Sequence, residues 1–394
     1  MNNHPDVHEI AGYYRYDINH LPVGLELGES ALRIVWDDGR RSEYHYLWLR
    51  DNCPCHECIS ELSREQVFEI CDVPLTIRPE TATLTEDGRL DIVWDHEAHK
   101  SRYHPGWLRK HCYSDEAREE RVLKPVIWEK GQIDRSLPTY GFADIMEDDG
   151  VLLNWLRGQR DYGLCLVEGV PTLPGTVQAI ANRISFIRET NFGVLFDVQS
   201  KPDANSAAYT TLRLPLHTDL PTRELQPGLQ FLHCLVNDAS GGESILVDGF
   251  RIAEEMREHY PEDFAALSTL PMDFYNKDRD TDYRFRATAL KLDSEGNVSE
   301  VRIANFLRGP LDLPGGDIAA LYKAYRQFML LTRESRFQYF RQLQAGDMIV
   351  FDNRRVLHAR NAFDLKAGDR HLQGCYVDRD ELLSRIRVLE RTYG

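Results

Sequence analysis

A histidine and an aspartate stand two positions apart in the stretch LPLHTDLPTRELQPG, as His217 and Asp219. On an extended strand, residues i and i+2 project from the same face, so both side chains could bind one metal ion. A third ligand is available in MIVFDNRRVLHARNAF, where His358 lies near the end of an apolar strand pattern. Two imidazoles and one carboxylate on one face of an ion leave neighbouring positions open, as in Fe(II) oxygenases. The sequence therefore predicts a ferrous site.

An arginine begins the later segment RHLQGCYVD. By the two-residue period of a strand, Arg370 shares one face with Leu372, Gly374 and Tyr376. A guanidinium that points into an otherwise apolar face requires an anionic partner. A dicarboxylate cosubstrate would meet that need, with one end on the iron and the other accepting bidentate hydrogen bonds from the guanidinium. The alternative is a structural salt bridge with one of the 63 acidic residues.

Three cysteines are crowded into the segment DNCPCHEC, at Cys53, Cys55 and Cys58. Thiolates this close repel one another unless a cation lies among them, and tetrahedral zinc with sulfur and nitrogen ligands is the usual solution. The fourth ligand must come from elsewhere, and the pattern alone does not choose it. The candidates are His56, His96, His99, Cys71 and Cys112. Four protein ligands leave no open position, so we expect this zinc to be structural.

The cysteine cluster lies in a region with a weak internal repeat. LRIVWDDGRRSEYHYLWLRDNC begins at Leu32, and LDIVWDHEAHKSRYHPGWLRKHC begins at Leu90. Each copy reads as a strand, a polar turn, a second strand and an aromatic W-L-R segment. We therefore expect residues 1–120 to form a small zinc-binding β domain of two related hairpin units, although two unrelated hairpins would give a similar pattern. Residues 121–140 are charged and then irregular with two prolines, which predicts a linker.

Residues 141–394 are expected to form the catalytic domain. EDDGVLLNWLRGQRDYG and TVQAIANRISFI have helical patterns on either side of the apolar strand LCLVEGV. Further along, short strands and Gly/Pro turns predominate, interrupted by two helical segments, RIAEEMREHYPEDFAALSTL and IAALYKAYRQFMLLTRE. Many short strands with a few long helices favour a mainly β fold, a sandwich or barrel with outer helices.

Composition narrows the classes of function. The chain has 394 residues, of which 42% are hydrophobic and 28% charged, as in a soluble globular protein with an ample core. A net charge of −16 and the lack of a long basic stretch make nucleic acid and anionic membrane unexpected partners. No apolar run approaches the ~20 residues of a membrane helix, and MNNHPDVHEI lacks the layout of a signal peptide. Three crowded cysteines suit metal binding in a reducing compartment, so we expect a cytoplasmic location.

Taken in order, these motifs resemble those of the γ-butyrobetaine hydroxylases, within the Fe(II)/2-oxoglutarate dioxygenases of the taurine-dioxygenase type. The resemblance covers nearly the whole chain. It rests on the segments WLRDNCPCHEC, ANSAAYTT, LPLHTDLPTRELQPGLQFLHCL, GGESILVDGF, FDNRRVLHAR and RHLQGCYVDRDELLSR. It implies a C-terminal double-stranded β-helix, or jelly roll, and a homodimer. It also implies Fe(II), a structural zinc, and 2-oxoglutarate and dioxygen as cosubstrates.

Three sets of ligands follow from this resemblance. The implied iron ligands are His217, Asp219 and His358. The implied zinc ligands are Cys53, Cys55, Cys58 and His99, the last because HKSRY matches the family's segment at that histidine. The residues implied to bind 2-oxoglutarate are Arg370 and, as lesser contacts, Leu232 and Ser244.

The substrate of such enzymes carries a trimethylammonium group, which aromatic faces stabilise through their ring quadrupoles. The positions that match the family's substrate site are Phe192, Phe196, Tyr209, Tyr376 and Ser206, and Asn205 could contact the substrate's anion. Each aromatic residue could instead be ordinary core, because aromatics make up 10% of the chain. The implied reaction is the hydroxylation of γ-butyrobetaine to L-carnitine, which belongs to carnitine biosynthesis.

The chain departs from some members of this family at three positions. Those members carry Trp at Phe196, Tyr at Leu220 and Asn at Ser206, and the Tyr and the Asn serve the anionic end of their substrate. A related quaternary amine, 2-trimethylammonioethylphosphonate or trimethyllysine, is therefore an alternative substrate, with Arg284 and Arg286 as further candidates for contacting an anion.

Two alternatives belong to other classes of protein. One is a non-catalytic protein that binds a quaternary amine, against which the intact triad argues. The other is a zinc hydrolase that uses the same three ligands, but no general base is identifiable and Arg370 would have no role.

Overall fold

The computed structural model describes residues 15–199, 211–364 and 368–393. The chain divides into two compact units, an N-terminal unit of Met1–Leu123 and a C-terminal unit of Lys124–Gly394. The segment 121–140, expected to be a linker, instead contains helix α5 (Lys130–Ser136) and strand β7 (Thr139–Gly141) of the C-terminal unit. The reason is apolar burial, because Trp128 and Ile133 are fully buried in the core of that unit.

The N-terminal unit contains two three-stranded antiparallel sheets, each followed by a short helix. The first sheet consists of β1 (Pro22–Leu27), β2 (Ala31–Trp36) and β3 (Arg41–His45), and α2 (Tyr46–Asp51) follows it. The second consists of β4 (Pro79–Leu84), β5 (Leu90–Trp94) and β6 (Lys100–Tyr103), and α3 (Pro105–Lys110) follows it. A 3-10 turn, η1 (Ile70–Asp72), and α4 (Asp115–Arg121) complete the unit.

The two copies of the internal repeat hold each other by reciprocal hydrogen bonds. Tyr44 of the first copy donates its hydroxyl to the carbonyl of Leu108 in the second copy, at 2.6 Å. The equivalent Tyr103 donates to the carbonyl of Leu49, at 2.5 Å. Both tyrosines are fully buried. This exchange confirms that the repeat is structural, since two unrelated hairpins would have no reason to share it.

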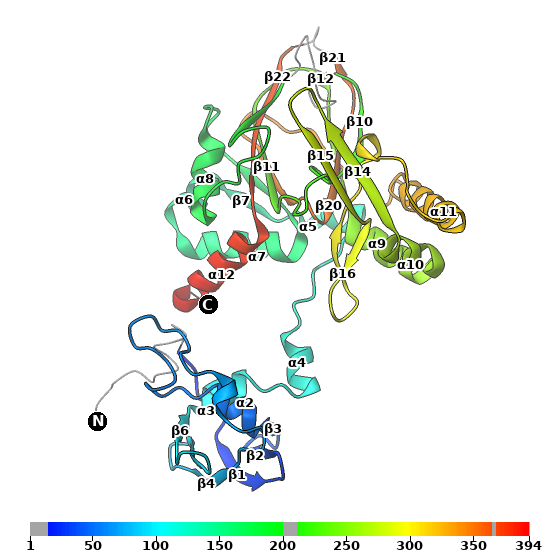
Figure 1. The fold of residues 1–394 in the computed structure, drawn as a ribbon. Helices are drawn as coiled ribbons and strands as arrows, with labels where there is room; N and C mark the ends of the chain where they lie inside the picture. Colours follow the sequence, from blue (N-terminus) through cyan, green and yellow to red (C-terminus); the bar gives the residue numbers. More distant parts are fainter. Residues whose placement is uncertain (1–14, 200–210, 365–367, 394) are drawn as a thin grey trace. The chain divides into compact units, whose positions relative to one another are not determined.

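The C-terminal unit is built on two β-sheets, with helices outside them (Figure 1). The larger sheet has the order β7, β8 (Leu164–Glu168), β19 (Met348–Asp352), β11 (Leu229–Asn237), β22 (Arg370–Val377) and β9 (Phe196–Gln199). The smaller sheet has the order β10 (Leu214–His217), β20 (Val356–Arg360), β13 (Ser244–Asp248) and β18 (Tyr339–Arg341). Leu246 and Val356 of the smaller sheet pack with Phe351 and Leu372 of the larger one, so the sheets face each other.

Three strand pairs extend this framework. They are β12 (Ser240–Gly241) with β21 (Phe363–Asp364), β14 (Pro271–Lys277) with β15 (Asp282–Thr288), and β16 (Leu290–Leu292) with β17 (Val298–Val301). A short 3-10 helix, η3 (Asn305–Leu307), follows β17.

The helices form the outer layers. Packed with the larger sheet are α6 (Phe142–Glu147), α7 (Asp149–Tyr162), α8 (Thr176–Ile184) and α12 (Arg379–Tyr393). Packed with the smaller sheet are α9 (Gly249–His259), α10 (Pro261–Thr269) and α11 (Gly315–Leu331). Among the described residues, no helix is both long and apolar enough to cross a membrane. The predicted mainly β fold with outer helices, a jelly roll, is confirmed.

Candidate active site and zinc centre

The structure brings the three predicted iron ligands together at the junction of β10 and β20. His217 and His358 stand opposite each other in this antiparallel pair, with ring centroids 4.2 Å apart. Asp219 Oδ1 lies 3.1 Å from His217 Nε2 and 3.5 Å from His358 Nε2. Ligand atoms about 2.1 Å from an ion and at right angles to each other lie about 3 Å apart. The cluster therefore fits one divalent ion bound by all three side chains.

Asp219 does not lie on a strand, so the expectation that it shares a strand face with His217 is wrong. Strand β10 ends at His217, and Leu220 has a left-handed φ of +52°. The Asp219 backbone is instead bracketed by the buried side chain of Asn353. Asn353 Oδ1 accepts a hydrogen bond from the Asp219 N–H at 2.7 Å, and Asn353 Nδ2 donates one to the Asp219 carbonyl at 3.1 Å. A turn fixed by Asn353, rather than strand periodicity, directs the carboxylate toward the histidines.

Hydrogen bonds and charge favour the metal-binding forms of these side chains. His217 Nδ1 lies 2.8 Å from the carbonyl of Pro215, to which it donates in the tautomer that leaves Nε2 free to bind a metal. Burial acts to raise the pKa of Asp219, but its interactions with His358 and His217 outweigh this effect and hold that pKa well below its usual range. Burial lowers the pKa of His358, which favours its neutral form. A carboxylate and neutral imidazoles are the forms that bind metal.

Arg370 lies buried at the start of β22, only 4% exposed. No acidic side chain among the described residues forms an ion pair with it, so a structural salt bridge does not account for its burial. Burial lowers the pKa of Arg370 to about 10. The predicted lesser contacts are also in place on the sheets, since Leu232 pairs with Gly374 across β11 and β22, and Ser244 lies in β13.

A second buried arginine, Arg360, was missed in the sequence. It follows His358 by two positions on β20 and therefore shares its face of the strand. Burial and the charge of Arg370 lower the pKa of Arg360 to about 10. Its signal in the sequence was the H-x-R spacing. Two buried guanidinium groups close together make this part of the site strongly attractive to a carboxylate.

An aromatic cluster borders the triad, formed by Phe192, Phe196 and Tyr376 and called here the aromatic wall. The ring of Phe196 lies 5.0 Å from that of Tyr376 and 6.3 Å from that of Phe192. Leu220 packs against this cluster. The Tyr376 hydroxyl donates to Asp219 Oδ2 at 2.7 Å, so the wall directly adjoins the candidate metal site.

The other residues predicted to contact the substrate either lie outside the described residues or bind other groups of the protein. Tyr209, Asn205 and Ser206 lie outside the described residues. Arg284 is exposed on β15 and pairs with Asp282, at 2.6 Å. Arg286 donates to the carbonyl of Asp312 at 2.5 Å.

Phe306 is a neighbour of the triad that the sequence did not indicate. Its ring meets the His217 imidazole edge-on, with centroids 5.1 Å apart, and it is 43% exposed. It belongs to η3, between β17 and α11, and no motif marks it. An exposed aromatic ring against a candidate metal ligand forms part of the rim of the site.

The cysteine cluster of the N-terminal unit has tetrahedral spacing. His99 Nε2 lies 3.3, 3.5 and 3.6 Å from the sulfur atoms of Cys53, Cys55 and Cys58. Zinc bonds of about 2.3 Å to sulfur and 2.0 Å to nitrogen at the tetrahedral angle predict about 3.5 Å. Of the five candidates for the fourth position, only His99 joins the three thiols among the described residues.

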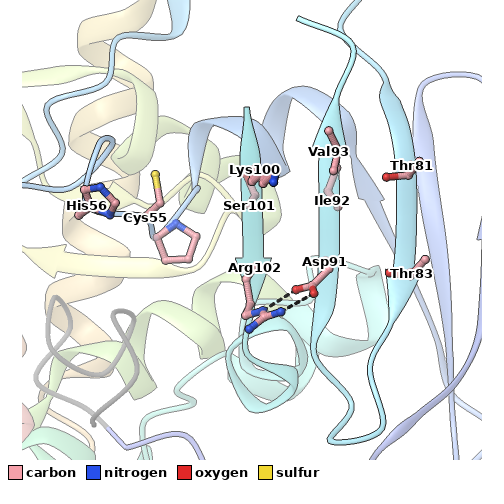
Figure 2. Close-up of a pocket in the computed structure, with 11 residues that line it drawn as sticks. Cys55, His56, Thr81, Thr83, Asp91, Ile92, Val93, Lys100, Ser101 and Arg102 are labelled. Carbon is pink, nitrogen blue, oxygen red and sulfur yellow. Dashed lines mark hydrogen bonds and ion pairs between the residues drawn. The ribbon is translucent and has the colours of Figure 1, made fainter. Parts of the chain in front are cut away.

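One thiol of this cluster has surroundings that favour its thiolate form. A hydrogen bond from Cys53 and the adjacent Arg50 guanidinium, 3.2 Å from the sulfur, help to lower the pKa of Cys58 to about 5. Figure 2 shows Cys55 and His56 beside the strands β4, β5 and β6, where they line a cavity of about 670 Å³. All four positions of the tetrahedron are filled by protein, so the chemistry expected of an open metal site belongs to the triad.

Comparison with known proteins identifies relatives of both units of the chain. Residues 130–376 match the family described as "Taurine catabolism dioxygenase TauD, TfdA family", and residues 24–101 match "Gamma-butyrobetaine hydroxylase-like, N-terminal". A gamma-butyrobetaine dioxygenase of Pseudomonas sp. (strain AK-1) is 56% identical over 92% of this chain and 94% of its own length.

More distant relatives extend over a similar part of the chain. The gamma-butyrobetaine dioxygenase of Homo sapiens is 33% identical over 92% of this chain and 95% of its own. A mitochondrial trimethyllysine dioxygenase of Bos taurus is 31% identical over 88% of this chain and 82% of its own. The chain therefore belongs to the TauD, TfdA family and is a dioxygenase that uses Fe(II), 2-oxoglutarate and dioxygen.

Proposed function

We propose that this enzyme hydroxylates γ-butyrobetaine to L-carnitine. The observation that carries the proposal is the contact between the aromatic wall and the triad, where the Tyr376 hydroxyl lies 2.7 Å from Asp219 Oδ2. A trimethylammonium group held on those rings would place the neighbouring carbons of a short chain beside the metal ligands. The 56% identity to the Pseudomonas gamma-butyrobetaine dioxygenase supports the same substrate.

In this proposal His217, Asp219 and His358 hold Fe(II) through one atom each. When bound, the iron would let dioxygen oxidise 2-oxoglutarate to succinate and carbon dioxide and a substrate C–H to C–OH, with one oxygen atom entering succinate and the other entering the new hydroxyl group. Arg370 binds the distal carboxylate of 2-oxoglutarate, next to the positive charge of Arg360, and Leu232 and Ser244 make lesser contacts. The role of Arg370 is supported by charge, because its buried guanidinium has no acidic partner within the described residues and a carboxylate would supply one.

Separate groups of residues bind the two ends of the substrate, a small zwitterion. The aromatic wall, with Tyr209, holds the cation. Asn205 and Ser206 contact the anion. Leu220 packs against the wall, where some relatives carry a tyrosine, so the anion pocket differs in its chemistry from theirs. The phosphonate analogue is therefore the second candidate substrate, and trimethyllysine the third.

The zinc site, the assembly and the location are further parts of the proposal. Cys53, Cys55, Cys58 and His99 hold a structural zinc, which the tetrahedral spacing supports. The enzyme is a homodimer, as its sequence resemblance implies. It works in the cytoplasm, which the eight unpaired cysteines support, because disulfides form in oxidising compartments.

A product assay tests the proposed function. The purified enzyme with Fe(II), 2-oxoglutarate and dioxygen is offered γ-butyrobetaine, 2-trimethylammonioethylphosphonate or trimethyllysine in separate reactions. Mass spectrometry should detect a product 16 Da heavier most rapidly with γ-butyrobetaine, together with an equal amount of succinate. Faster turnover of the phosphonate would replace the substrate assignment. Binding of the three amines with no succinate formed in any of the reactions would instead favour a non-catalytic amine-binding protein.

A further inference from the structure

The two carboxylate oxygens of Asp219 have different partners. Oδ1 faces the Nε2 atoms of His217 and His358, at 3.1 and 3.5 Å. Oδ2 accepts a hydrogen bond from the Tyr376 hydroxyl at 2.7 Å. Only one oxygen is therefore directed into the cluster of ligand atoms, while the other is already engaged.

We propose that Tyr376 is a positioning residue that limits Asp219 to one bond with the iron. The inference rests on the proposed function, in which the triad holds Fe(II). An octahedral ion has six positions, and three single-atom protein ligands leave three of them open. A chelating 2-oxoglutarate would take two of these positions and leave one for dioxygen. An Asp219 bound through both oxygens would fill the position that dioxygen requires.

The ring of Tyr376 is held in place by its neighbours, so the hydroxyl is directed before any ligand binds. The Phe196 ring lies 5.0 Å from it at an interplanar angle of 31°. Gly374 permits this packing, because a Cβ atom there would lie 2.6 Å from the Phe196 ring. A phenol that donates to a carboxylate makes a strong hydrogen bond, and here little side-chain freedom is lost in forming it.

The same side chain connects the substrate site to the metal site. Its ring belongs to the aromatic wall, and its hydroxyl contacts a metal ligand. A substrate cation bound to the aromatic wall would therefore contact Tyr376, the residue that controls how Asp219 binds the iron. In this proposal, one residue both contacts the substrate and keeps a metal position open for dioxygen.

A purely structural reading is that a buried tyrosine hydroxyl simply needs a partner. Tyr325 in α11 provides the comparison, since it is buried and its hydroxyl has no hydrogen-bond partner among the described residues. Tyr325→Phe therefore removes a buried hydroxyl of the same unit away from the site. It is the matched control for Tyr376→Phe.

The test uses nitric oxide as a probe for the open position, with no need for a substrate. The full-length Fe(II) protein is saturated with 2-oxoglutarate without oxygen and titrated with nitric oxide, and the nitrosyl complex is followed by electron paramagnetic resonance. Tyr376→Phe should bind nitric oxide about tenfold or more weakly, the effect of one charged hydrogen bond. Its Fe(II) affinity should be equal or greater, because Asp219 gains a second bond to the ion.

Tyr325→Phe should behave as the wild type in both measurements. Unchanged nitric oxide affinity in Tyr376→Phe, or an equal loss in both variants, overturns the inference. These outcomes are separate from a failure of the proposed function, which the wild-type product assay reports by itself. If another amine proves to be the substrate, the nitric oxide result still decides the role of the hydroxyl.

Discussion

Arg360 and Arg370 approach the same aromatic ring, with their guanidinium carbons 4.8 and 5.4 Å from the centroid of Phe363. They come from different sheets, on β20 and β22. Their like charges repel, and burial increases that cost. Gly242 leaves room for the Arg370 side chain, since a Cβ atom there would lie 3.1 Å from Arg370 Nε. A carboxylate bound between the two guanidinium groups would relieve this repulsion.

The first prediction follows from that pair of cations. Arg370→Gln should weaken 2-oxoglutarate binding by ~2–5 kcal/mol, because the distal carboxylate loses its charged partner. That loss is about 30-fold or more in the dissociation constant, which calorimetry on the Fe(II) protein can measure. Arg284→Gln is the control, since it removes an exposed arginine that pairs with Asp282. Equal cosubstrate affinity in wild type and Arg370→Gln would exclude the assigned role.

The second prediction concerns Asn353. Asn353→Ala removes both hydrogen bonds that bracket the Asp219 backbone. The loop that carries the carboxylate should loosen, and Fe(II) affinity should fall about tenfold, as expected for losing one or two buried hydrogen bonds. Metal titration gives the affinity, and thermal unfolding gives the accompanying loss of stability.

The control for Asn353 is a buried amide elsewhere in the same unit. Gln338 donates Nε2 to the carbonyl of Thr332 at 2.8 Å. Gln338→Ala should reduce thermal stability but leave Fe(II) affinity unchanged. If both variants lose iron affinity equally, Asn353 contributes general stability and no specific positioning.

The residues that the sequence revealed lie in short motifs or follow strand periodicity. The thiols of Cys53, Cys55 and Cys58 are close in the chain, so their proximity in space needs no knowledge of the fold. The face of Arg370 could be derived from the two-residue period of its strand, and Leu372 does lie between the sheets as that period requires.

Other features of the site depend on contacts between segments that are far apart in the chain, and the sequence alone does not show them. Asn353 is separated from Asp219 by 134 positions. The pattern left His99 as one candidate among several because its choice depends on how the second hairpin folds back, across 46 positions from Cys53. Asp219 itself was assigned correctly to the cluster for an incorrect reason, since a turn and not a strand directs it.

The third prediction concerns zinc. Cys58→Ala should unfold the N-terminal unit, because a structural zinc contributes about 10–16 kcal/mol, as much as a whole domain's usual stability. Zinc content should fall, and hydrogen exchange should become fast over residues 20–115 but stay slow in the sheets of the C-terminal unit. Cys71→Ala is the control, because this cysteine is exposed and lies outside the cluster. Retained zinc and slow exchange in Cys58→Ala would contradict the structural role.

The fourth prediction is a dependence of stability on pH that arises from His233. This residue is fully buried on β11, and neither ring nitrogen has a partner among the described residues. Burial lowers the pKa of His233 to about 4. As pH falls below about 6.5, His233 becomes protonated in the unfolded chain but stays neutral in the folded chain. The free energy of unfolding therefore decreases until about pH 4, where the folded chain is also protonated.

Replacing His233 with an apolar residue should remove this dependence. Between pH 6.5 and pH 5 the contribution is at most about 2 kcal/mol, at about 1.4 kcal/mol for each pH unit. Denaturant unfolding of wild type and His233→Leu at both pH values measures it, with His259→Leu as the control for an exposed histidine on α9. The unfolding free energy of His233→Leu should rise relative to that of the wild type between pH 6.5 and pH 5, since only the wild type has the His233 imidazole to protonate. A difference that is constant with pH would mean that the folded protein accommodates the charged ring.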